Sequence, residues 1–254
     1  MATLQGELDA LVSGWAGRSG VAVMDLQTGQ IVGVNIDQQQ VSACVVKIFI
    51  MMAVAEDIEA GKYTAASVDD LVRDAMGPSN TWPARELTIL AGGGNLTTGV
   101  LRVNAIMQSL GMTRSVMPHP PGYPEIDHGL GTGEIYITGR DMVVALGKLY
   151  RGEALSAWAT DYVLWSMTIA IPGQQQSLGG GIPYSATLYH KIGLLYAPND
   201  VWNDAGVVTF QRDGREYAYA IASLSSDSGN WLNGYYYGTA ASATAWQTIS
   251  PVYP

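Results

Sequence analysis

The chain has 254 residues, of which 48% are hydrophobic and 14% are charged, and its formal net charge is −9. This length accommodates one sizeable domain or two closely packed ones. The acidic balance argues against nucleic acid or an anionic membrane as the main partner. A single cysteine excludes an internal disulfide, and the apolar run at 43–55 is too short and too interrupted to span a bilayer.

Residues 1–40 are expected to form one helix followed by a β-hairpin. Alternating apolar runs in GVAVMDLQTGQIVGVN, residues 20–35, flank a Gln-Thr-Gly turn and predict two antiparallel strands. Residues 1–17 hold two acids and lack the basic-then-apolar pattern of a signal peptide, so an export signal is either missing or was removed. The helix is predicted over 3–16, where apolar residues recur at helical spacing: Leu4, Leu8, Leu11 and Trp15.

The middle of the chain has mostly helical patterns. In VSACVVKIFIMMAVA, residues 41–55, apolar residues share one helical face, and 65–112 is helical in pieces broken at GPSNTWP and AGGGNLTTG. Residues 119–133 are rich in proline and glycine and have no periodicity. A loop of this length inside a compact domain is usually functional. Helical spacing returns over 138–168, where Thr138 is placed to cap the helix.

The last third of the chain predicts strands and one terminal helix. LYHKIGLLYA, DAGVVTFQRDG and REYAYAIASLS alternate or are rich in β-branched and aromatic residues. The clearest turn between them is Asp213-Gly214. Residues 237–249 are Ala-rich and compatible with a helix.

This order of elements predicts an α/β protein of the α+β type. One antiparallel sheet is built from N- and C-terminal strands and flanked by helices, and an all-helical subdomain is inserted into it. We expect a single domain over 1–254. Its α/β subdomain would comprise 1–40 and 183–254, and its helical subdomain 41–182.

Cys44 and Lys47 are a candidate catalytic pair within the most apolar run of the chain. A spacing of three on a helix places both side chains on one face. Burial lowers the pKa of a lysine and makes its amine available as a base, and a base beside a nucleophile activates it. The cation also favours the thiolate of a cysteine. In the alternative interpretation, Lys47 reaches the surface and Cys44 is a small core residue.

Short motifs with a known order run through the chain. CVVK (44–47) is followed by the GPSNT turn and then by YHKIGLLY, which holds Lys191 and Gly193 at the head of a strand. In this order they resemble the penicillin-recognising serine hydrolases, most closely the class A β-lactamase group, whose signature is S-x-x-K, S-D-N and K-T-G. Cys44 stands where that family has its nucleophilic serine. The hairpin at 20–35 and the segments LGMTRS and ITGRDMVVAL are also similar, so the resemblance covers nearly the full length.

The second motif departs from the family pattern. The resemblance places Asn80 at the asparagine position, as a substrate-binding residue, and places the serine position on Pro78, or on Ser79 if the loop shifts by one residue. Ser79 is able to supply a hydroxyl that shuttles a proton, so we take it as catalytic. The alternative is a plain turn before a helix, which these residue types favour.

At the third motif the resemblance implies a catalytic Lys191 and substrate contacts from Ile192, Gly193 and Leu194. Apolar residues replace the hydroxyls that would bind a substrate carboxylate, so we expect a less anionic and more apolar acyl substrate than a penicillin. Several aromatic residues are candidates to line such a pocket, although packing is the simpler role for most of them: Trp82, Tyr184, Tyr189, Tyr196, Trp231 and Tyr235.

The run YPEID resembles the family's Ω-loop sequence E-P-E-L-N, in which the first glutamate activates the water that releases the acyl-enzyme. Tyr123 stands at that glutamate's position, and Glu125 is two residues further on. Efficient β-lactam hydrolysis is therefore not expected. With an ordinary pKa near 10, Tyr123 is a poor base, but its hydroxyl is able to orient a substrate.

The three histidines, His119, His128 and His190, show no carboxylate pattern typical of a metal site. We expect surface positions for all three, with His190 facing the opposite side of its strand from Lys191. The sequence predicts no metal and no cofactor.

Three explanations are open for Cys44. It is a Ser→Cys variant made to slow turnover, or the nucleophile of a natural thiol acyltransferase, or a vestige in a protein without turnover. Because everything around Cys44 follows the family pattern, we favour the substituted nucleophile.

The resulting prediction is an acyl-transfer enzyme: an esterase, amidase, weak lactamase or acyltransferase. Residue 44 attacks a carbonyl, Lys47 accepts the proton, and Ser79 relays it to the leaving group. Backbone N–H groups of residue 44 and of the strand after Lys191 hold the oxyanion. The alternative is a non-catalytic ligand-binding protein that keeps the fold.

The expected partner is a small ester, amide or lactam, with no nucleic acid and no membrane insertion, and the oligomeric state is left open. The resemblance implies a secreted or periplasmic location, with a cytoplasmic one as the alternative.

Overall fold

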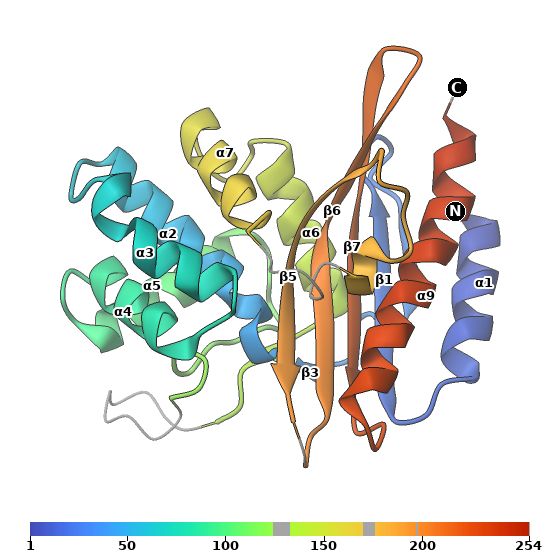
Figure 1. The fold of residues 1–254 in the computed structure, drawn as a ribbon, viewed down its shortest axis with the longest axis horizontal. Coiled ribbons are helices and arrows are strands. Elements are labelled where there is room, and N and C mark those ends of the chain that lie inside the picture. Colours follow the sequence, from blue (N-terminus) through green and yellow to red (C-terminus); the bar gives the residue numbers. More distant parts are fainter. Residues whose placement is uncertain (124–132, 170–175, 197, 254) are drawn as a thin grey trace.

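A five-stranded sheet lies between two terminal helices on one face and a larger group of helices on the other (Figure 1). The structure is a computed structural model that describes residues 1–123, 133–169, 176–196 and 198–253. The sheet contains β1 (Arg18–Asp25), β2 (Ile31–Val34), β5 (Thr187–Leu195), β6 (Val201–Arg212) and β7 (Arg215–Ser226), and a separate pair contains β3 (Gln40–Val41) and β4 (Tyr136–Ile137).

The described helices fall into the same two groups. The terminal pair is α1 (Ala2–Ser13) and α9 (Trp231–Ile249), and the short helices are η1 (Ala43–Val46), α8 (Gln176–Gly179) and η2 (Ser250–Val252). The larger group contains α2 (Lys47–Glu59), α3 (Ala65–Met76), α4 (Thr81–Ala91), α5 (Leu96–Ser109), α6 (Gly139–Tyr150) and α7 (Ala157–Ser166).

The sheet joins the two ends of the chain. Its strand order is β2-β1-β7-β6-β5, and every pairing is antiparallel. The N-terminal strand β1 pairs with β7 from Arg18, opposite Ser226, to Asp25, opposite Tyr219. The predicted sheet of N- and C-terminal strands is therefore confirmed, and β5 lies at its edge.

The two faces of the sheet belong to different cores because strand side chains alternate. In β7, Ala218 and Ala220 face the larger helical group, whereas Tyr219 and Ile221 face α1 and α9. The small side chains let α6 lie close to the sheet, so that a Cβ added at Gly139 would approach the Cβ of Ala22 at 3.1 Å.

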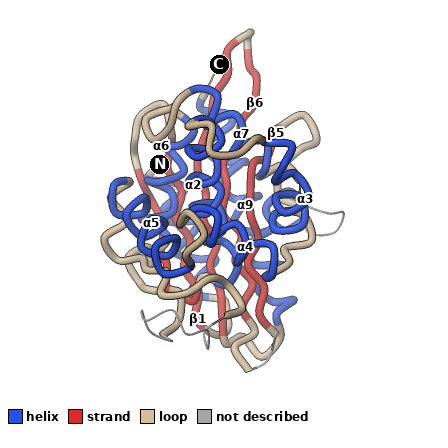
Figure 2. Tube along the Cα trace, turned by 90° about the vertical axis from the view of Figure 1, so that its left-hand side faces the viewer, coloured by secondary structure: helices blue, strands red, loops and turns tan. Residues whose placement is uncertain are grey.

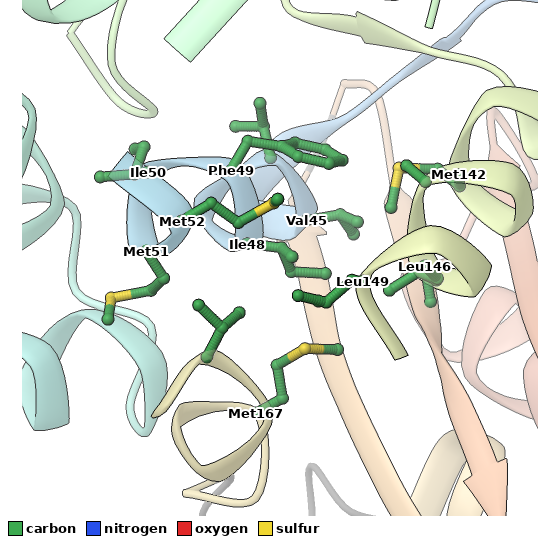
Figure 3. Packing of buried hydrophobic residues seen from close by; sticks show 14 of the residues in the cluster. Val45, Ile48, Phe49, Ile50, Met51, Met52, Met142, Leu146, Leu149 and Met167 are labelled. Carbon is green, nitrogen blue, oxygen red and sulfur yellow. The ribbon is translucent and has the colours of Figure 1, made fainter. Parts of the chain in front are cut away.

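Helix α2 is at the centre of the larger helical group. Every residue from Lys47 to Ala55 is buried, as expected for a helix that is apolar on all sides. Figure 3 shows Ile48 and Met52 of α2 among side chains from α6 and the end of α7. Figure 2, seen from the side of the larger helical group, shows the helices of that group in front of the strands.

Local sequence signals explain several element ends. The Thr138 side chain accepts a hydrogen bond from the Asp141 backbone N–H at 3.1 Å, which confirms the predicted cap of α6. Asp213 and Gly214, both with positive φ (49° and 76°), form the predicted tight turn between β6 and β7.

One predicted helix begins later than expected. The pattern at 41–55 predicted a continuous helix, but α2 begins at Lys47, and Cys44 lies in the 3₁₀ turn η1 before it. Ala43 has a φ of +48°, in the left-handed region, so the chain cannot enter an α-helix there. The described residues do not include Glu125, Asp127 or His128. The division into the two predicted subdomain ranges stays a prediction.

None of the described helices combines the length and the apolar character needed to cross a membrane.

Replacing Ile48 by alanine is expected to lower the free energy of unfolding by about 2–5 kcal/mol, because its side chain is 1% exposed in close-packed surroundings. Urea denaturation measures this change. Leu101→Ala on α5 is the control, since that side chain is 55% exposed, and it should cost less than about 0.5 kcal/mol. Equal losses for the two variants would contradict the central placement of α2.

Candidate active site

The Cys44 sulfur lies at the start of the helical group, held by a short 3₁₀ turn. The Ser42 hydroxyl accepts a hydrogen bond from the Val46 N–H at 3.1 Å and stabilises this turn. A 3₁₀ helix has three residues per turn, so Cys44 and Lys47 still lie on the same side, as predicted. Cys44 is 8% exposed and Lys47 is 1% exposed. The interpretation of Lys47 as a surface lysine is therefore wrong.

The Lys47 amine is surrounded by backbone oxygens. It donates to the carbonyl oxygens of Ser79 at 2.6 Å and Asn80 at 2.8 Å, with the Ala75 oxygen further away at 3.4 Å. A buried amine needs such partners, because an unsatisfied one would be costly. These contacts tie α2 to the turn that precedes α4.

Ser79 connects the two lysines. Its hydroxyl oxygen lies 2.7 Å from the Lys191 amine and 3.4 Å from the Lys47 amine. Ser79 has a φ of +65°, an uncommon conformation for a residue with a Cβ, and such strain is often found at functional sites. Its carbonyl oxygen also accepts from Lys47 and, at 3.9 Å, from the Cys44 thiol.

Lys191 completes the cluster from the edge strand β5. It is 2% exposed, and its amine also donates to the Ile192 carbonyl oxygen at 3.0 Å. Burial lowers the pKa of Lys191 to about 7, which the neighbouring Lys47 ammonium also favours, against the opposing effects of Cys44 and Asp204.

The three groups also change one another's acidity. Burial lowers the pKa of Lys47, while the nearby Cys44 sulfur opposes this shift. For Cys44, burial by itself raises the pKa of the thiol, but the Lys47 and Lys191 ammonium groups and hydrogen bonds from Ser79 and Lys47 outweigh it, so the pKa is lowered overall. The arrangement therefore favours a thiolate next to amines that lose their protons easily.

Gly193 allows β5 to contact the turn that carries Cys44. A Cβ at this position would lie 2.5 Å from the Ser42 oxygen and 3.0 Å from the Cys44 nitrogen. The His190 N–H bonds to the Met167 oxygen outside the sheet, so by alternation the Leu194 N–H also faces this free edge. The segment that carries the Cys44 N–H and the strand that carries the outward-facing Leu194 N–H are thus in close contact at Gly193.

Asn203 is a positioning residue that the sequence analysis missed. It is fully buried on β6, and its amide nitrogen donates to the carbonyl oxygens of Val41 at 2.6 Å and Ser42 at 3.3 Å. Its amide oxygen accepts from the Ser225 N–H at 3.0 Å. Its place in the sequence carries little signal, because Asn203 directly precedes the run from Asp204 that is predicted as a strand.

Cys44 and Ser79 line a cavity of about 450 Å³, whereas Lys47 and Lys191 are not among its described lining residues. The described lining is mostly apolar, and Glu134 is its one acidic or basic side chain apart from the imidazole of His119. The lining comprises Val41, Ala43, Cys44, Pro78, Ser79, Thr81, His119, Pro121, Gly122, Glu134, Ile135, Ile192, Leu194, Leu195 and Tyr196.

The predicted substrate-binding residues are distributed unevenly around this cavity. Ile192 and Leu194 line it, whereas Asn80 supplies its carbonyl oxygen to Lys47, and Thr81, which was not predicted, lines the cavity beside Ser79. Tyr123 is not among the described lining residues. Its ring lies against Arg85, whose guanidinium carbon is 5.6 Å from the ring centroid.

Two of the histidines correct the expectation of surface positions. His119 is 5% exposed and lines the cavity, with its Nδ1 2.8 Å from the Pro120 oxygen. His190 is 3% exposed and its Nδ1 lies 2.8 Å from a carboxylate oxygen of buried Asp204. In each case a neighbouring oxygen lies within hydrogen-bond distance of Nδ1, which lowers the cost of burying the ring. Within the described residues, no group of three histidine, cysteine or acidic side chains is arranged to hold a metal ion.

Comparisons with known proteins identify the family and the fold. The model of the "Beta-lactamase enzyme family" matches residues 3–249. No curated protein sequence matches the chain at a significant level.

Solved structures share the fold over almost the full length. A β-lactamase from Chitinophaga pinensis is 18% identical with a TM-score of 0.80, covering 96% of this chain and 98% of that one. The TLA-3 extended-spectrum β-lactamase is 17% identical, with a TM-score of 0.82 and 98% coverage of both chains. PBP-A is 19% identical, with a TM-score of 0.78 and coverage of 99% of this chain and 97% of that one.

Alkylation of Cys44 by iodoacetamide is expected to follow a pH profile whose midpoint lies below the ordinary cysteine value of about 8.5. In Lys47→Met the midpoint should move upward, because a positive charge that stabilises the thiolate is lost. Each unit of pKa rise lowers the thiolate fraction about tenfold well below the midpoint. Lys62→Met is the control, since Lys62 is an exposed lysine and its buried partner Asp57 keeps the ion pair with Arg102. An unchanged midpoint in Lys47→Met would contradict the electrostatic coupling.

Proposed function

The chain belongs to the beta-lactamase enzyme family, and we propose that it is an acyl-transfer enzyme that forms a covalent acyl-enzyme on residue 44. The family and the fold support a hydrolase of the serine acyl-transfer type. The identity of the acyl donor and acceptor, and the use of cysteine as nucleophile, belong to the proposal.

The observation that carries this proposal is the position of the Ser79 hydroxyl between two buried amines beside the Cys44 sulfur. It lies 2.7 Å from the Lys191 amine and 3.4 Å from the Lys47 amine, and Ser79 and Cys44 line the same cavity. A nucleophile, a base and a hydroxyl relay within one small space form the arrangement that covalent catalysis requires.

In the first half of the reaction Lys47 acts as the base. Burial lowers the pKa of Lys47, which makes its neutral form, the form that acts as a base, easier to reach. A neutral amine has two hydrogens, which the carbonyl oxygens of Ser79 and Asn80 accept, and one lone pair, which takes the Cys44 proton. The thiolate then attacks the substrate carbonyl.

The oxyanion that forms is held by backbone groups. The N–H of Cys44 and the outward-facing N–H of Leu194 are the proposed donors, since Gly193 brings their two segments together. Donors placed in this way typically stabilise such intermediates by several kcal/mol. The Ser79 hydroxyl passes a proton to the leaving group and is reprotonated through Lys47 or Lys191.

The substrate is proposed to be a small ester, amide or lactam with little negative charge. Ile192, Leu194 and Ile135 give the cavity an apolar lining. A mutant of PBP-A, the similar protein above, has been solved as an acyl-enzyme complex with penicillin G, which supports covalent acylation as chemistry compatible with this fold.

A non-catalytic ligand-binding protein is the second candidate. It is favoured by the position of Tyr123, whose ring lies against Arg85 at the point where the family carries its water-activating glutamate. Such a protein would bind acyl compounds in the cavity without forming a bond to Cys44.

Acylation of residue 44 distinguishes the two candidates. The protein and its Cys44→Ser variant are incubated with p-nitrophenyl esters and a chromogenic cephalosporin, and the adduct is measured by intact mass. We expect an adduct on residue 44 that decreases at least about tenfold in Lys47→Met and is unaffected in Lys62→Met. Absence of an adduct with every donor would support the binding protein. Faster turnover in Cys44→Ser would support a substituted nucleophile.

Gly193→Ala is expected to reduce acylation by about 10²-fold or more, because the added methyl group would push β5 away from the Cys44 nitrogen and separate the two oxyanion donors. The initial rate of p-nitrophenol release measures this. Gly6→Ala on α1 is the matched control, since a Cβ there meets no atom within 4 Å. An active Gly193→Ala protein would argue against this oxyanion site.

A further inference from the structure

We propose that the cavity transfers acyl groups from thioester donors to amine acceptors. This inference rests on the acyl-enzyme proposed above and takes Cys44 as the nucleophile that the protein uses. Three features support it: the sulfur and its leaving-group chemistry, the apolar lining, and Glu134.

The first feature is the acidity of Cys44. A tetrahedral intermediate preferentially expels the weaker base of its two possible leaving groups. The Cys44 thiolate is a weaker base than an alkoxide or an amide nitrogen, and the two lysines weaken it further by lowering its pKa. With an oxygen ester or an amide, the intermediate therefore returns to the free thiolate unless the leaving group receives a proton. With a thioester, the leaving group is itself a thiolate, which departs far more readily than an alkoxide or an amide nitrogen, so no proton is needed at that step.

Most N–H groups of the two lysine amines near Cys44 already donate hydrogen bonds to other acceptors. The Lys47 amine donates to the carbonyl oxygens of Ser79 and Asn80, and the Lys191 amine donates to the Ser79 hydroxyl and the Ile192 oxygen. The Ser79 hydroxyl, which accepts from Lys191, is then the proton source of the described cluster that lines the cavity beside the sulfur. Donors whose departure needs no proton fit this arrangement best.

The second feature is the apolar lining, which fits an uncharged acyl chain. Val41, Ile135, Ile192, Leu194 and Leu195 line the cavity above the sulfur. None of the described lining residues is a lysine or an arginine. An acyl donor with a carboxylate would therefore lose its hydration in the cavity without gaining a cationic partner among the lining residues.

The third feature selects the acceptor. Glu134 is an exposed carboxylate that lines the same cavity as Cys44, and its negative charge attracts an acceptor that carries a protonated amino group in addition to the neutral amine that reacts. No other acidic side chain is present in the described lining to activate water, and Tyr123 lies against Arg85. Thioesters are also intrinsically more reactive towards amines than towards water.

The two steps balance. The Cys44 thiolate attacks R–CO–SR′, a bond forms between the Cys44 sulfur and the carbonyl carbon, the C–SR′ bond breaks, and R′S⁻ leaves. A neutral amine R″NH₂ then attacks the Cys44 thioester, a C–N bond forms, the C–S bond to Cys44 breaks, and one amine proton passes through Lys47 to the released thiolate. The products are R–CO–NHR″ and R′SH, and no oxidation or reduction occurs.

A matched pair of donors tests the donor class. Hexanoyl-N-acetylcysteamine, a thioester, is compared with the corresponding hexanoyl ester of N-acetylethanolamine, and the acyl adduct on residue 44 is measured by intact mass. We expect the thioester to acylate the protein at least about tenfold faster than the oxygen ester. In Cys44→Ser this ratio should fall towards one, because an oxygen nucleophile gains little from a sulfur leaving group.

Cadaverine tests the acceptor. The acylated protein should release N-hexanoylcadaverine faster than hexanoate, and Glu134→Gln should raise KM for cadaverine several-fold. KM for aminoacetonitrile, which is neutral at pH 8, should change less. Glu153→Gln, which removes a surface carboxylate paired with Arg151, is the control for net charge.

The outcomes separate this inference from the proposed function. Equal acylation by the two donors, or release of hexanoate alone in the presence of cadaverine, would overturn the thioester-to-amine assignment while leaving the acyl-enzyme in place. Absence of an adduct from both these donors and the p-nitrophenyl esters would overturn the acyl-enzyme itself.

Discussion

The candidate site depends on keeping two lysine amines and one cysteine sulfur out of water within a small space. Lys47 and Lys191 are almost completely buried, yet their amines are held by carbonyl oxygens and by the Ser79 hydroxyl. Burying two amines side by side would be very costly if both remained charged, so the site favours states in which at least one proton has left. The cost of burying two positive charges therefore makes one amine available as a base and the neighbouring thiol more acidic.

The large-scale architecture follows from local sequence patterns, which is why the sheet could be predicted. Alternation with period two identified the hairpin at 20–35 and the three C-terminal strands, and the tight turn at Asp213-Gly214 identified their connection. Cys44 and Lys47 could also be paired, because a lysine in the most apolar run of a chain calls for an explanation. That run is the central helix of the molecule, which imposes burial on Lys47.

The details of the site could not be predicted, because they depend on backbone conformations and contacts between distant segments. The left-handed conformation of Ser79 directs its carbonyl oxygen to Lys47 and places Thr81, in place of Asn80, at the cavity. A serine gives no sequence signal of a positive φ. Similarly, the buried pairing of His190 with Asp204 requires the register of β5 and β6, which a single sequence does not specify.

The pairing of His190 with Asp204 has a consequence for how the acidity of the site is controlled. His190 and Lys191 are adjacent in sequence but point to opposite faces of β5, and the Asp204 carboxylate, which also accepts the Leu178 N–H of α8, acts to raise the pKa of Lys191. Asp204 thus slightly offsets the burial that dominates the acidity of Lys191, and it does so from outside the described lining of the cavity. A substitution at Asp204 would therefore change the acidity of Lys191 modestly without removing a side chain that lines the cavity.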